Sequence, residues 1–392
     1  MTSTTLGLYI HIPFCESKCA YCDFYSLPGT DKAKIDAYLA ALLRHMRETA
    51  EFTGIKSSKS GGWMVDSVYI GGGTPPVFGA QRIAKILKTV NKFWQVSQSA
   101  EITAEANPGS LDYKSLKLLR KAGVNRLSIG VQAVQAPLLE ILGRAHTAEQ
   151  AADCVRDAQR AGFDNIGVDL MYGIPGQTSE QLHDALRAAL SWEVQHVSLY
   201  GLKLEEGTPL HALAPALPSD DAQAKQYLAA VDYLERHGFS QYEISNFSVP
   251  SRQSRHNYKY WTLEPYIGFG PAAHSDFGGK RYGHARDLDA YIRNIEAGEA
   301  VIEELNQISP LERAGEYIML GLRTVQGISG NDYTRRYKVS FDLIEKKLEL
   351  LAKHGFAQCQ GERWRLTPKG FLVSNRILSE LLESEVDREL IC

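Results

Sequence analysis

Strand-like and helix-like segments alternate regularly along the N-terminal part of this chain, and this alternation restricts the architectures open to it. Between residues 1 and 245, six short apolar runs of β character, such as 6–13, 65–72 and 165–175, alternate with helical segments such as 34–52. Repeated strand–helix units form parallel sheets joined by right-handed crossovers. The sequence therefore predicts an α/β fold, with residues 1–245 forming a partial (βα)6 barrel that resembles part of a TIM barrel.

The alternation stops after residue 245. Residues 246–305 are a connecting region rich in aromatic residues, Gly and Pro, which predicts an irregular cap or a return strand. Residues 306–392 indicate two or three helices and a hairpin that turns at Gly361 and Glu362, an order similar to a winged helix. Basic and acidic residues are nearly balanced there, so a structural or docking role is expected rather than DNA binding.

Composition narrows the location and the partners. The net charge of −3 gives no reason to expect a nucleic-acid partner. No apolar run approaches the roughly 20 residues of a membrane-spanning helix, and the N-terminus lacks the features of a signal peptide. A cytoplasmic location is expected. The polar stretch 53–62 is expected to be a loop tip.

Three of the six cysteines stand close together as Cys15, Cys19 and Cys22, whereas the other three are scattered and are expected to be ordinary thiols. Clustered cysteines in a large chain without secretion signals indicate a metal or redox site. Structural zinc sites usually have four protein ligands, which this segment does not supply. Three thiolates can hold a [4Fe–4S] cluster and leave one iron open to a small molecule. A redox loop or an incomplete zinc site is the alternative.

Polar residues and glycines recur where the predicted strands end. Residues 71–75, Gly-Gly-Gly-Thr-Pro, follow the second strand, and flexible glycines let backbone amides approach a ligand. Each polar residue alone could be a satisfied core group. Together they predict a site at the carboxyl rim of the barrel, where β/α barrels build their active sites. The residues are Glu105, Gln132, Asp169 and Lys203.

The cysteine segment CESKCAYC, the GGGTP segment and the strand–helix alternation resemble the radical S-adenosylmethionine (SAM) superfamily. The segments YIHIPFCESKCAYCDF, GGGTPP, EANP, LSIGVQ and LMYGIPGQT are similar to the oxygen-independent coproporphyrinogen III dehydrogenase-like (HemN-like) family over nearly the whole chain. The resemblance implies a [4Fe–4S] cluster on Cys15, Cys19 and Cys22, with SAM on the fourth iron. It also implies a HemN-type C-terminal domain.

The resemblance also assigns the remaining site residues. Tyr9 is expected beside the cluster and SAM, and Tyr21 is expected to face SAM. The amino end of SAM is expected at the glycine turn, and Arg144 is expected to clamp its carboxylate. Gln132 and Asp169 are expected on the ribose hydroxyls, and Lys203 is a looser match. The full set is Tyr9, Tyr21, Gly72, Gly73, Thr74, Glu105, Gln132, Arg144, Asp169 and Lys203.

Two departures from the dehydrogenases indicate the haem chaperones of the HemW type. Phe24 stands where the dehydrogenases have a fourth cysteine, and only eight residues precede Tyr9. The segment from His256 to Trp261 matches the HNxxYW motif of these chaperones. Imidazole is a natural axial ligand of haem iron, and Tyr258, Tyr260 and Trp261 offer flat faces to a porphyrin. A core histidine is the plainer interpretation of His256, and His274 is a second candidate.

The resemblance therefore implies a haem chaperone that holds a SAM-ligated [4Fe–4S] cluster and delivers haem to respiratory haemoproteins. Delivery is expected at the inner face of the membrane through peripheral contact, and a homodimer is one expected state. The alternative is a radical SAM enzyme that oxidatively decarboxylates porphyrinogen propionates. An interaction protein with a vestigial cluster is a third class. Whether the chain is an enzyme stays open.

Overall fold

The computed structural model describes residues 4–54 and 62–389. Contacts between residues divide the chain into two compact units, Met1–Gln223 with Glu264–Gln307, and Ala224–Leu263 with Ile308–Cys392. The domain boundaries expected after residues 245 and 305 stay predictions. Most of the stretch 53–62, expected to be a loop tip, lies outside the described residues.

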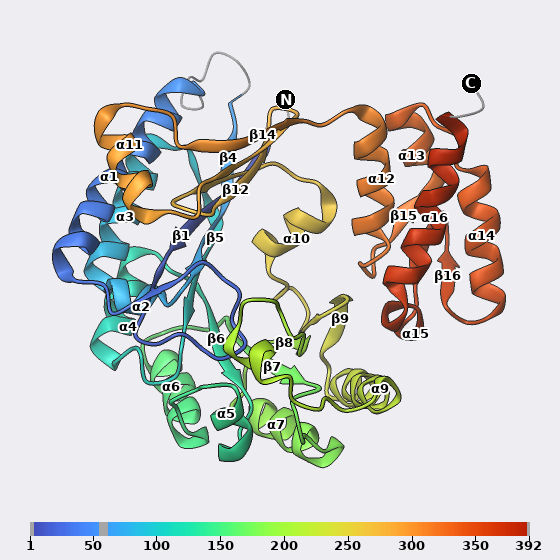
Figure 1. Ribbon diagram of the computed structural model, residues 1–392, viewed down its shortest axis with the longest axis horizontal. Coiled ribbons are helices and arrows are strands. Elements are labelled where there is room, and N and C mark those ends of the chain that lie inside the picture. Colours follow the sequence, from blue (N-terminus) through green and yellow to red (C-terminus); the bar gives the residue numbers. More distant parts are fainter. Residues whose placement is uncertain (1–3, 55–61, 390–392) are drawn as a thin grey trace. The chain divides into compact units, whose positions relative to one another are not determined.

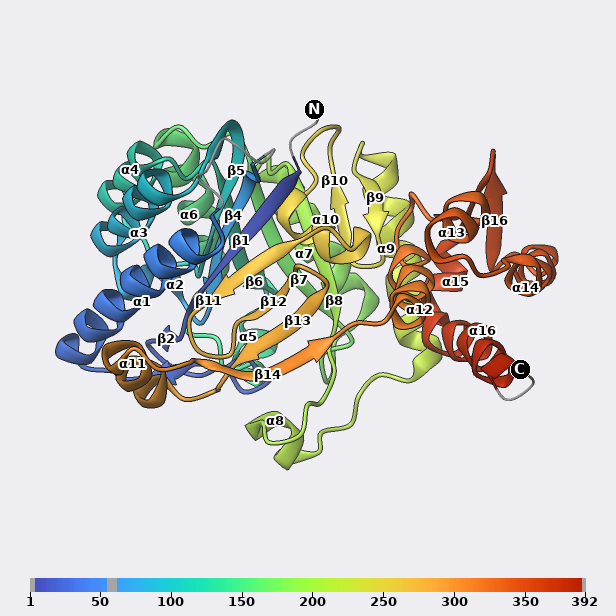
Figure 2. The same cartoon turned by 90° about the horizontal axis from the view of Figure 1, so that it is seen from above.

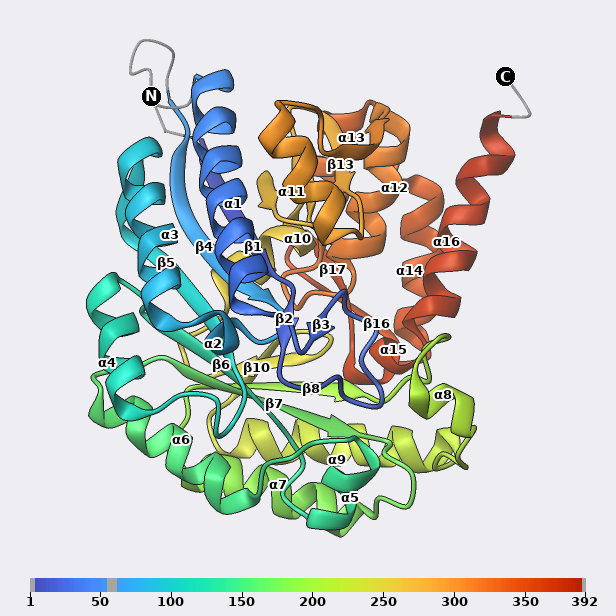
Figure 3. The ribbon, with the colours of Figure 1, turned by 60° about the vertical axis from the view of Figure 1, so that its left-hand side comes forward.

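The first unit is built on six parallel strands, each followed in the chain by helices. The strands pair in the order β1-β4-β5-β6-β7-β8, and the helices α1, α3, α4, α6 and α7 run along the outer side of this curved sheet (Figure 3). The predicted (βα)6 arrangement is confirmed. The elements are β1 (Thr5–Ile12), α1 (Lys32–Phe52), β4 (Met64–Gly72), α2 (Pro75–Phe78), α3 (Ala80–Phe93), β5 (Val96–Ala106), α4 (Tyr113–Ala122), β6 (Arg126–Gln132), α5 (Ala136–Ile141), α6 (Ala148–Arg160), β7 (Ile166–Tyr172), α7 (Ser179–Ser191), β8 (His196–Gly201) and α8 (Pro209–Leu213).

Local sequence explains these elements. All residues of β6 are buried, as expected of a parallel strand covered on both faces. The helix α3 buries one stripe, formed by Ile83, Ile86, Leu87 and Val90 at helical spacing. The helices α6 and α7 both begin with a capping box. The side chain of the N-cap Thr accepts from the backbone N–H of the Gln three residues later, and the side chain of that Gln accepts from the backbone N–H of the Thr.

The aromatic connecting region contributes further strands to the first unit. The strand β11 (Tyr266–Phe269) pairs in parallel with the free edge of β1, so the expected return strand is present. Antiparallel neighbours then extend the sheet beside it (Figure 2). Glycines here permit close strand approach: a Cβ at Gly268 would collide with the backbone of His274. The added elements are β12 (His274–Phe277), β13 (Lys280–His284), α11 (Leu288–Ala297) and β14 (Ile302–Gln307).

The second unit contains most of α9 (Asp220–Arg236), a short strand pair, one further helix and a C-terminal module. The strands β9 (Ser240–Glu243) and β10 (Asn246–Ser248) are antiparallel, and α10 (Arg255–Thr262) follows them. The C-terminal helices surround a three-stranded sheet in the order β15-β17-β16, and its hairpin turns at Gly361–Glu362 as predicted (Figure 1). The module comprises α12 (Pro310–Gly321), β15 (Ile328–Ser329), α13 (Gly330–Tyr337), α14 (Asp342–Lys353), β16 (Ala357–Gln360), β17 (Arg363–Leu366), α15 (Pro368–Leu372) and α16 (Ser374–Glu389).

The interior of the barrel is polar rather than purely apolar. Buried hydrophilic side chains from neighbouring strands include Ser67, Thr103, Arg126, Ser128 and His196. Polar groups of this kind are buried only where they find partners or serve a site. Among the described helices, none is both long enough and apolar enough to cross a bilayer.

Candidate functional site

A cavity of about 130 Å³ lies at the carboxyl ends of the strands in the first unit, and the predicted cysteines share it with most of the predicted SAM contacts. Strand ends from β4 to β7 and the loop after β1 supply the lining. The predicted residues that line it are Cys15, Cys19, Tyr21, Cys22, Gly72, Gly73, Thr74, Glu105, Gln132, Arg144 and Asp169.

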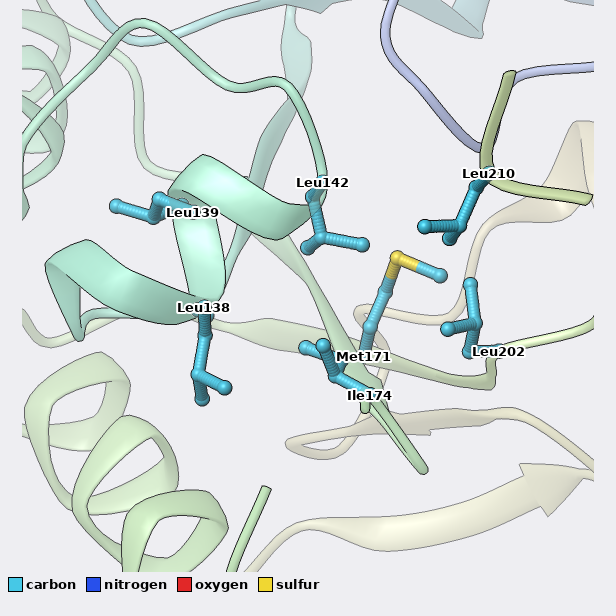
Figure 4. Packing of buried hydrophobic residues seen from close by; sticks show 8 residues of the cluster. Leu138, Leu139, Leu142, Met171, Ile174, Leu202 and Leu210 are labelled. Carbon is cyan, nitrogen blue, oxygen red and sulfur yellow. The ribbon is translucent and has the colours of Figure 1, made fainter. Parts of the chain in front are cut away.

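The cysteine loop is anchored on a buried apolar cluster beneath the site. The cluster is formed by Ala133, Leu138, Leu139, Leu142, Met171, Ile174, Leu202 and Leu210, most of which are drawn in Figure 4. Ala20 and Tyr21, between the second and third cysteines, pack against it. The Ala20 amide donates to Leu142 O at 3.0 Å, and its carbonyl accepts from the Leu210 amide at 2.8 Å. The loop backbone is therefore held in place by protein contacts.

The surroundings of the thiols suit metal-bound sulfur. Thr74 Oγ1 lies 3.5 Å from Cys15 Sγ, and Arg144 Nη1 lies 3.3 Å from Cys19 Sγ. Burial raises the pKa of Cys22, so the thiolate there needs a positive partner such as a metal centre. Within residues 4–54 and 62–389, no three His, Cys, Asp or Glu side chains converge as a single metal ion would require. Cys15, Cys19 and Cys22 share one cavity, and three thiolates suit an iron–sulfur cluster with one iron left open better than a structural zinc site with four protein ligands.

The glycine turn after β4 packs directly against the cysteine loop. The Gly73 amide donates to Ile12 O at 2.8 Å, and the Thr74 amide donates to Phe14 O at 2.7 Å. A Cβ at Gly73 would lie 2.6 Å from Phe14 O and 3.0 Å from Cys15 Sγ. Gly72 has a φ of +113°, and a Cβ there would meet the ring of His11 at 2.5 Å. This turn requires glycine for its own packing as well as for access to a ligand.

Asn107, which the sequence analysis did not select, joins two predicted residues. Its Nδ2 donates to Thr74 Oγ1 at 3.0 Å, and its Oδ1 accepts from Arg144 Nη2 at 2.9 Å. Arg144 also donates to the carbonyl of Gly130. In the described part of the chain, the buried Nε of Arg144 has no hydrogen-bond partner. Arg144 lines this cavity, and a guanidinium group there suits an anionic ligand group such as the carboxylate of SAM.

Two carboxyl groups line the same cavity. Glu105 accepts from Tyr69 Oη at 2.7 Å and from the Gly72 amide at 3.0 Å, and Asp169 accepts from Ser128 Oγ at 3.2 Å. Burial raises the pKa of Glu105 to about 7, and burial also raises the pKa of Asp169. These acceptors can take hydroxyl or cationic groups of a ligand.

Gln132 is held in an unusual backbone conformation at the end of β6. It is buried, has a φ of +66° and follows a register shift between Gly130 and Gln132 in the pairing with β7. A non-glycine residue in this region is uncommon, and such irregularities often redirect a side chain at a site. The sequence offers no local signal for this conformation.

The geometry of the thiols, the glycine turn and the polar rim agrees with comparisons to known proteins. The family model "Radical SAM superfamily" matches residues 9–189, and the model "HemN C-terminal domain" matches residues 308–373. The heme chaperone HemW of Bacillus subtilis (strain 168) is 36% identical over 380 residues, covering 95% of this chain and 98% of that protein. This chain belongs to the HemW family.

Other relatives agree with this membership. The heme chaperone HemW of Lactococcus lactis subsp. lactis (strain IL1403) is 34% identical, covering 97% of this chain and 98% of that protein. The solved structure of coproporphyrinogen III oxidase (HemN) from Escherichia coli, a radical SAM enzyme, has a TM-score of 0.83. It covers 97% of this chain and 90% of that chain at 22% identity, so it supports the fold alone.

Three of the predicted site residues do not line the cavity. Tyr9 lies next to it: its Oη is 3.0 Å from His11 Nδ1, and its ring stacks on Tyr69 at 6.2 Å. Lys203 is exposed and pairs with Glu205 at 2.9 Å. His256 belongs to α10 in the second unit. The alternative candidate His274 begins β12 and is exposed.

His11 is a further residue that the sequence analysis did not identify in this HemW-family site. It is buried between the glycine turn and the cysteine loop, and its Nε2 is 2.8 Å from Tyr25 O. Burial lowers the pKa of His11 to about 4, so the ring is neutral at physiological pH. The ring packs against the glycine turn at Gly72 and bonds to the backbone just after the cysteine loop.

Replacing Glu105 by Gln should change how stability depends on pH. The folded-state pKa of about 7 exceeds the ordinary value of 4.5. The contribution of Glu105 to stability is therefore complete below about pH 4.5 and is lost as the pH rises through about 7. Between pH 5 and pH 8, the wild-type free energy of unfolding should fall by ~1–3 kcal/mol more than that of Glu105→Gln.

Urea unfolding at both pH values measures this difference. Glu140→Gln removes an exposed carboxylate from α5 and is the matched control, which should behave like the wild type. Equal pH dependence in the wild type and Glu105→Gln would contradict the raised pKa.

Proposed function

We propose that this chain is a haem chaperone that carries a SAM-ligated [4Fe–4S] cluster. The observation that carries the proposal is its similarity to heme chaperones HemW over nearly the full length of both chains, at 36% identity for the Bacillus subtilis relative. The cavity supports the cluster and SAM, because the thiols and the polar groups suited to SAM meet there.

In this proposal Cys15, Cys19 and Cys22 hold the cluster. When bound, the cluster and SAM together supply one-electron chemistry. The chain's own groups position them: Thr74 and Arg144 donate to the thiolates, and the Arg144 guanidinium is proposed to bind the SAM carboxylate. The carboxylates of Glu105 and Asp169 accept from amino and hydroxyl groups.

The helix α10 is the proposed haem-binding element. It carries His256 with the half-buried aromatic side chains Tyr258, Tyr260 and Trp261, which suit the face of a porphyrin. Arg255 is exposed in the first helical turn and has the charge that pairs with a haem propionate. In this proposal the cysteine loop holds the cluster, and the helix α10 binds haem.

The proposal extends to the acceptors. Respiratory haemoproteins would take the haem at the inner face of the membrane, reached by peripheral contact from the cytoplasm, and a homodimer is one assembly in which this could occur. Phe24 supports chaperone work over the dehydrogenase reaction, because it replaces the fourth cysteine and is 69% exposed beside the cavity.

An anaerobic titration of cluster-reconstituted protein with ferric haem, followed by absorbance, tests the proposal. Saturable binding of one haem per chain is expected. Bovine serum albumin is an unsuitable control because it binds haem, so lysozyme at equal concentration reports nonspecific partition. Binding that does not saturate would contradict the chaperone function, and cleavage of SAM with coproporphyrinogen III would then be the activity to measure.

A further inference from the structure

A phenol and an imidazole form a hydrogen-bonded pair on α10. Tyr260 Oη lies 2.9 Å from His256 Nε2, and the two rings are perpendicular with centroids 5.3 Å apart. The residues are four apart, so they share one helix face. His256 is fully buried, whereas Tyr260 is only half-buried. The pair therefore has an enclosed partner and a more accessible one.

Both side chains of this pair can ligate haem iron in proteins, since imidazole and phenolate are each known axial ligands. Each would use the atom that the other already contacts, so only one of them can occupy the iron while the pair stays intact. Coordination through His256 Nε2 requires the pair to separate and the buried ring to become exposed. Coordination through Tyr260 Oη requires neither.

We propose that Tyr260 is the haem-iron ligand and that His256 is its positioning residue. The inference rests on the proposed haem-chaperone function. Ferric iron exchanges an axial water for the Tyr260 oxygen, so an Fe–O(water) bond breaks and an Fe–O(phenolate) bond forms. The phenol O–H bond breaks, and its proton passes to His256 Nε2. The iron stays ferric and no electron is transferred.

The rest of the second unit holds α10 in a fixed position for this role. The Ser254 amide at the start of the helix donates to Tyr242 Oη at 3.2 Å, and the Tyr258 hydroxyl donates to Gln326 Oε1 at 3.0 Å. The rings of Tyr242 and Tyr258 meet edge to face at 6.0 Å. The strand β9 and the segment before β15 therefore both anchor the helix that carries Tyr260 and His256.

Resonance Raman spectroscopy of the full-length protein with ferric haem tests the assignment. The wild type should show iron-phenolate vibrations that shift when tyrosine is ring-deuterated. Tyr260→Phe should lose them and bind ferric haem at least about tenfold more weakly. His256→Gln, which keeps a polar side chain, and His256→Ala should retain the phenolate vibrations and weaken binding by about tenfold through loss of a charge-assisted hydrogen bond.

Tyr233→Phe is the matched control, because Tyr233 of the second unit also lies four residues from a histidine, His237. This variant should leave the resonance Raman spectrum and the affinity for ferric haem unchanged. Imidazole ligation that persists in Tyr260→Phe and disappears in His256→Gln would overturn the inference and leave the chaperone function intact. Phenolate vibrations that persist in Tyr260→Phe would also overturn it. Absence of saturable binding by the wild type would overturn both proposals.

Discussion

Cys19→Ser is expected to abolish the iron–sulfur cluster, with loss of its absorbance and of its paramagnetic resonance signal after reduction. Cys19 lies on the shared cavity, and its Sγ accepts from Arg144 Nη1 at 3.3 Å. Serine offers a harder oxygen donor that is protonated at neutral pH, so two thiolates would remain for a cluster that needs three from the protein. Iron and sulfide per chain should fall from about four to near zero.

Cys359→Ser is the matched control for this loss. Cys359 is an exposed free thiol in β16 of the second unit, so its replacement tests the general effect of removing a cysteine. It should keep the full iron and sulfide content after the same reconstitution. A complete [4Fe–4S] cluster in Cys19→Ser would contradict the assignment of this residue as a ligand.

Residues with a strong local pattern could be predicted from the sequence. The cysteine spacing, the glycine turn and the strand-end position of Glu105 and Asp169 can each be recognised within a short stretch of sequence. In the structure these residues line the same cavity. The six-unit barrel was predictable for the same reason, since alternating apolar strands and amphipathic helices are local features.

Other parts of the site depend on contacts between distant segments. Asn107 matters because it bridges Thr74 and Arg144, which lie on different loops. Asn107 stands in the EANP segment directly after β5, and this position at a strand end was the available signal. Tyr69 and Ser128 look like ordinary strand residues until the parallel register sets them beside the carboxyl groups.

Strand-end position alone was not enough for Lys203. It follows β8 by two residues, yet its side chain is exposed and pairs with Glu205. Beyond the end of a strand the direction of a side chain is set by the loop, which the alternation of the strand no longer governs. The role of Lys203 toward SAM therefore stays a prediction.

Gly73→Ala is expected to prevent cluster assembly although it removes no ligand. The added Cβ would lie 2.6 Å from Phe14 O, 2.9 Å from Ile12 O and 3.0 Å from Cys15 Sγ. Two of these atoms are backbone carbonyls that accept from the Gly73 and Thr74 amides, so they cannot move away as a flexible side chain would. Overpacking of this kind typically costs ~1–3 kcal/mol.

Gly315→Ala supplies the control, because a Cβ in that helix would find its nearest neighbour, Leu382 Cδ2, at an ordinary 3.5 Å. It should keep the cluster and stabilise α12 by roughly 0.5–1 kcal/mol. Iron and sulfide content with thermal unfolding separates the effects. A full cluster in Gly73→Ala would mean that the glycine turn serves the ligand alone. If Gly73→Ala lacks the cluster even when it is reconstituted in the absence of SAM, the glycine turn is needed to position Cys15. The close packing of Gly73 on Cys15 would then determine the geometry of both the cluster site and the SAM site.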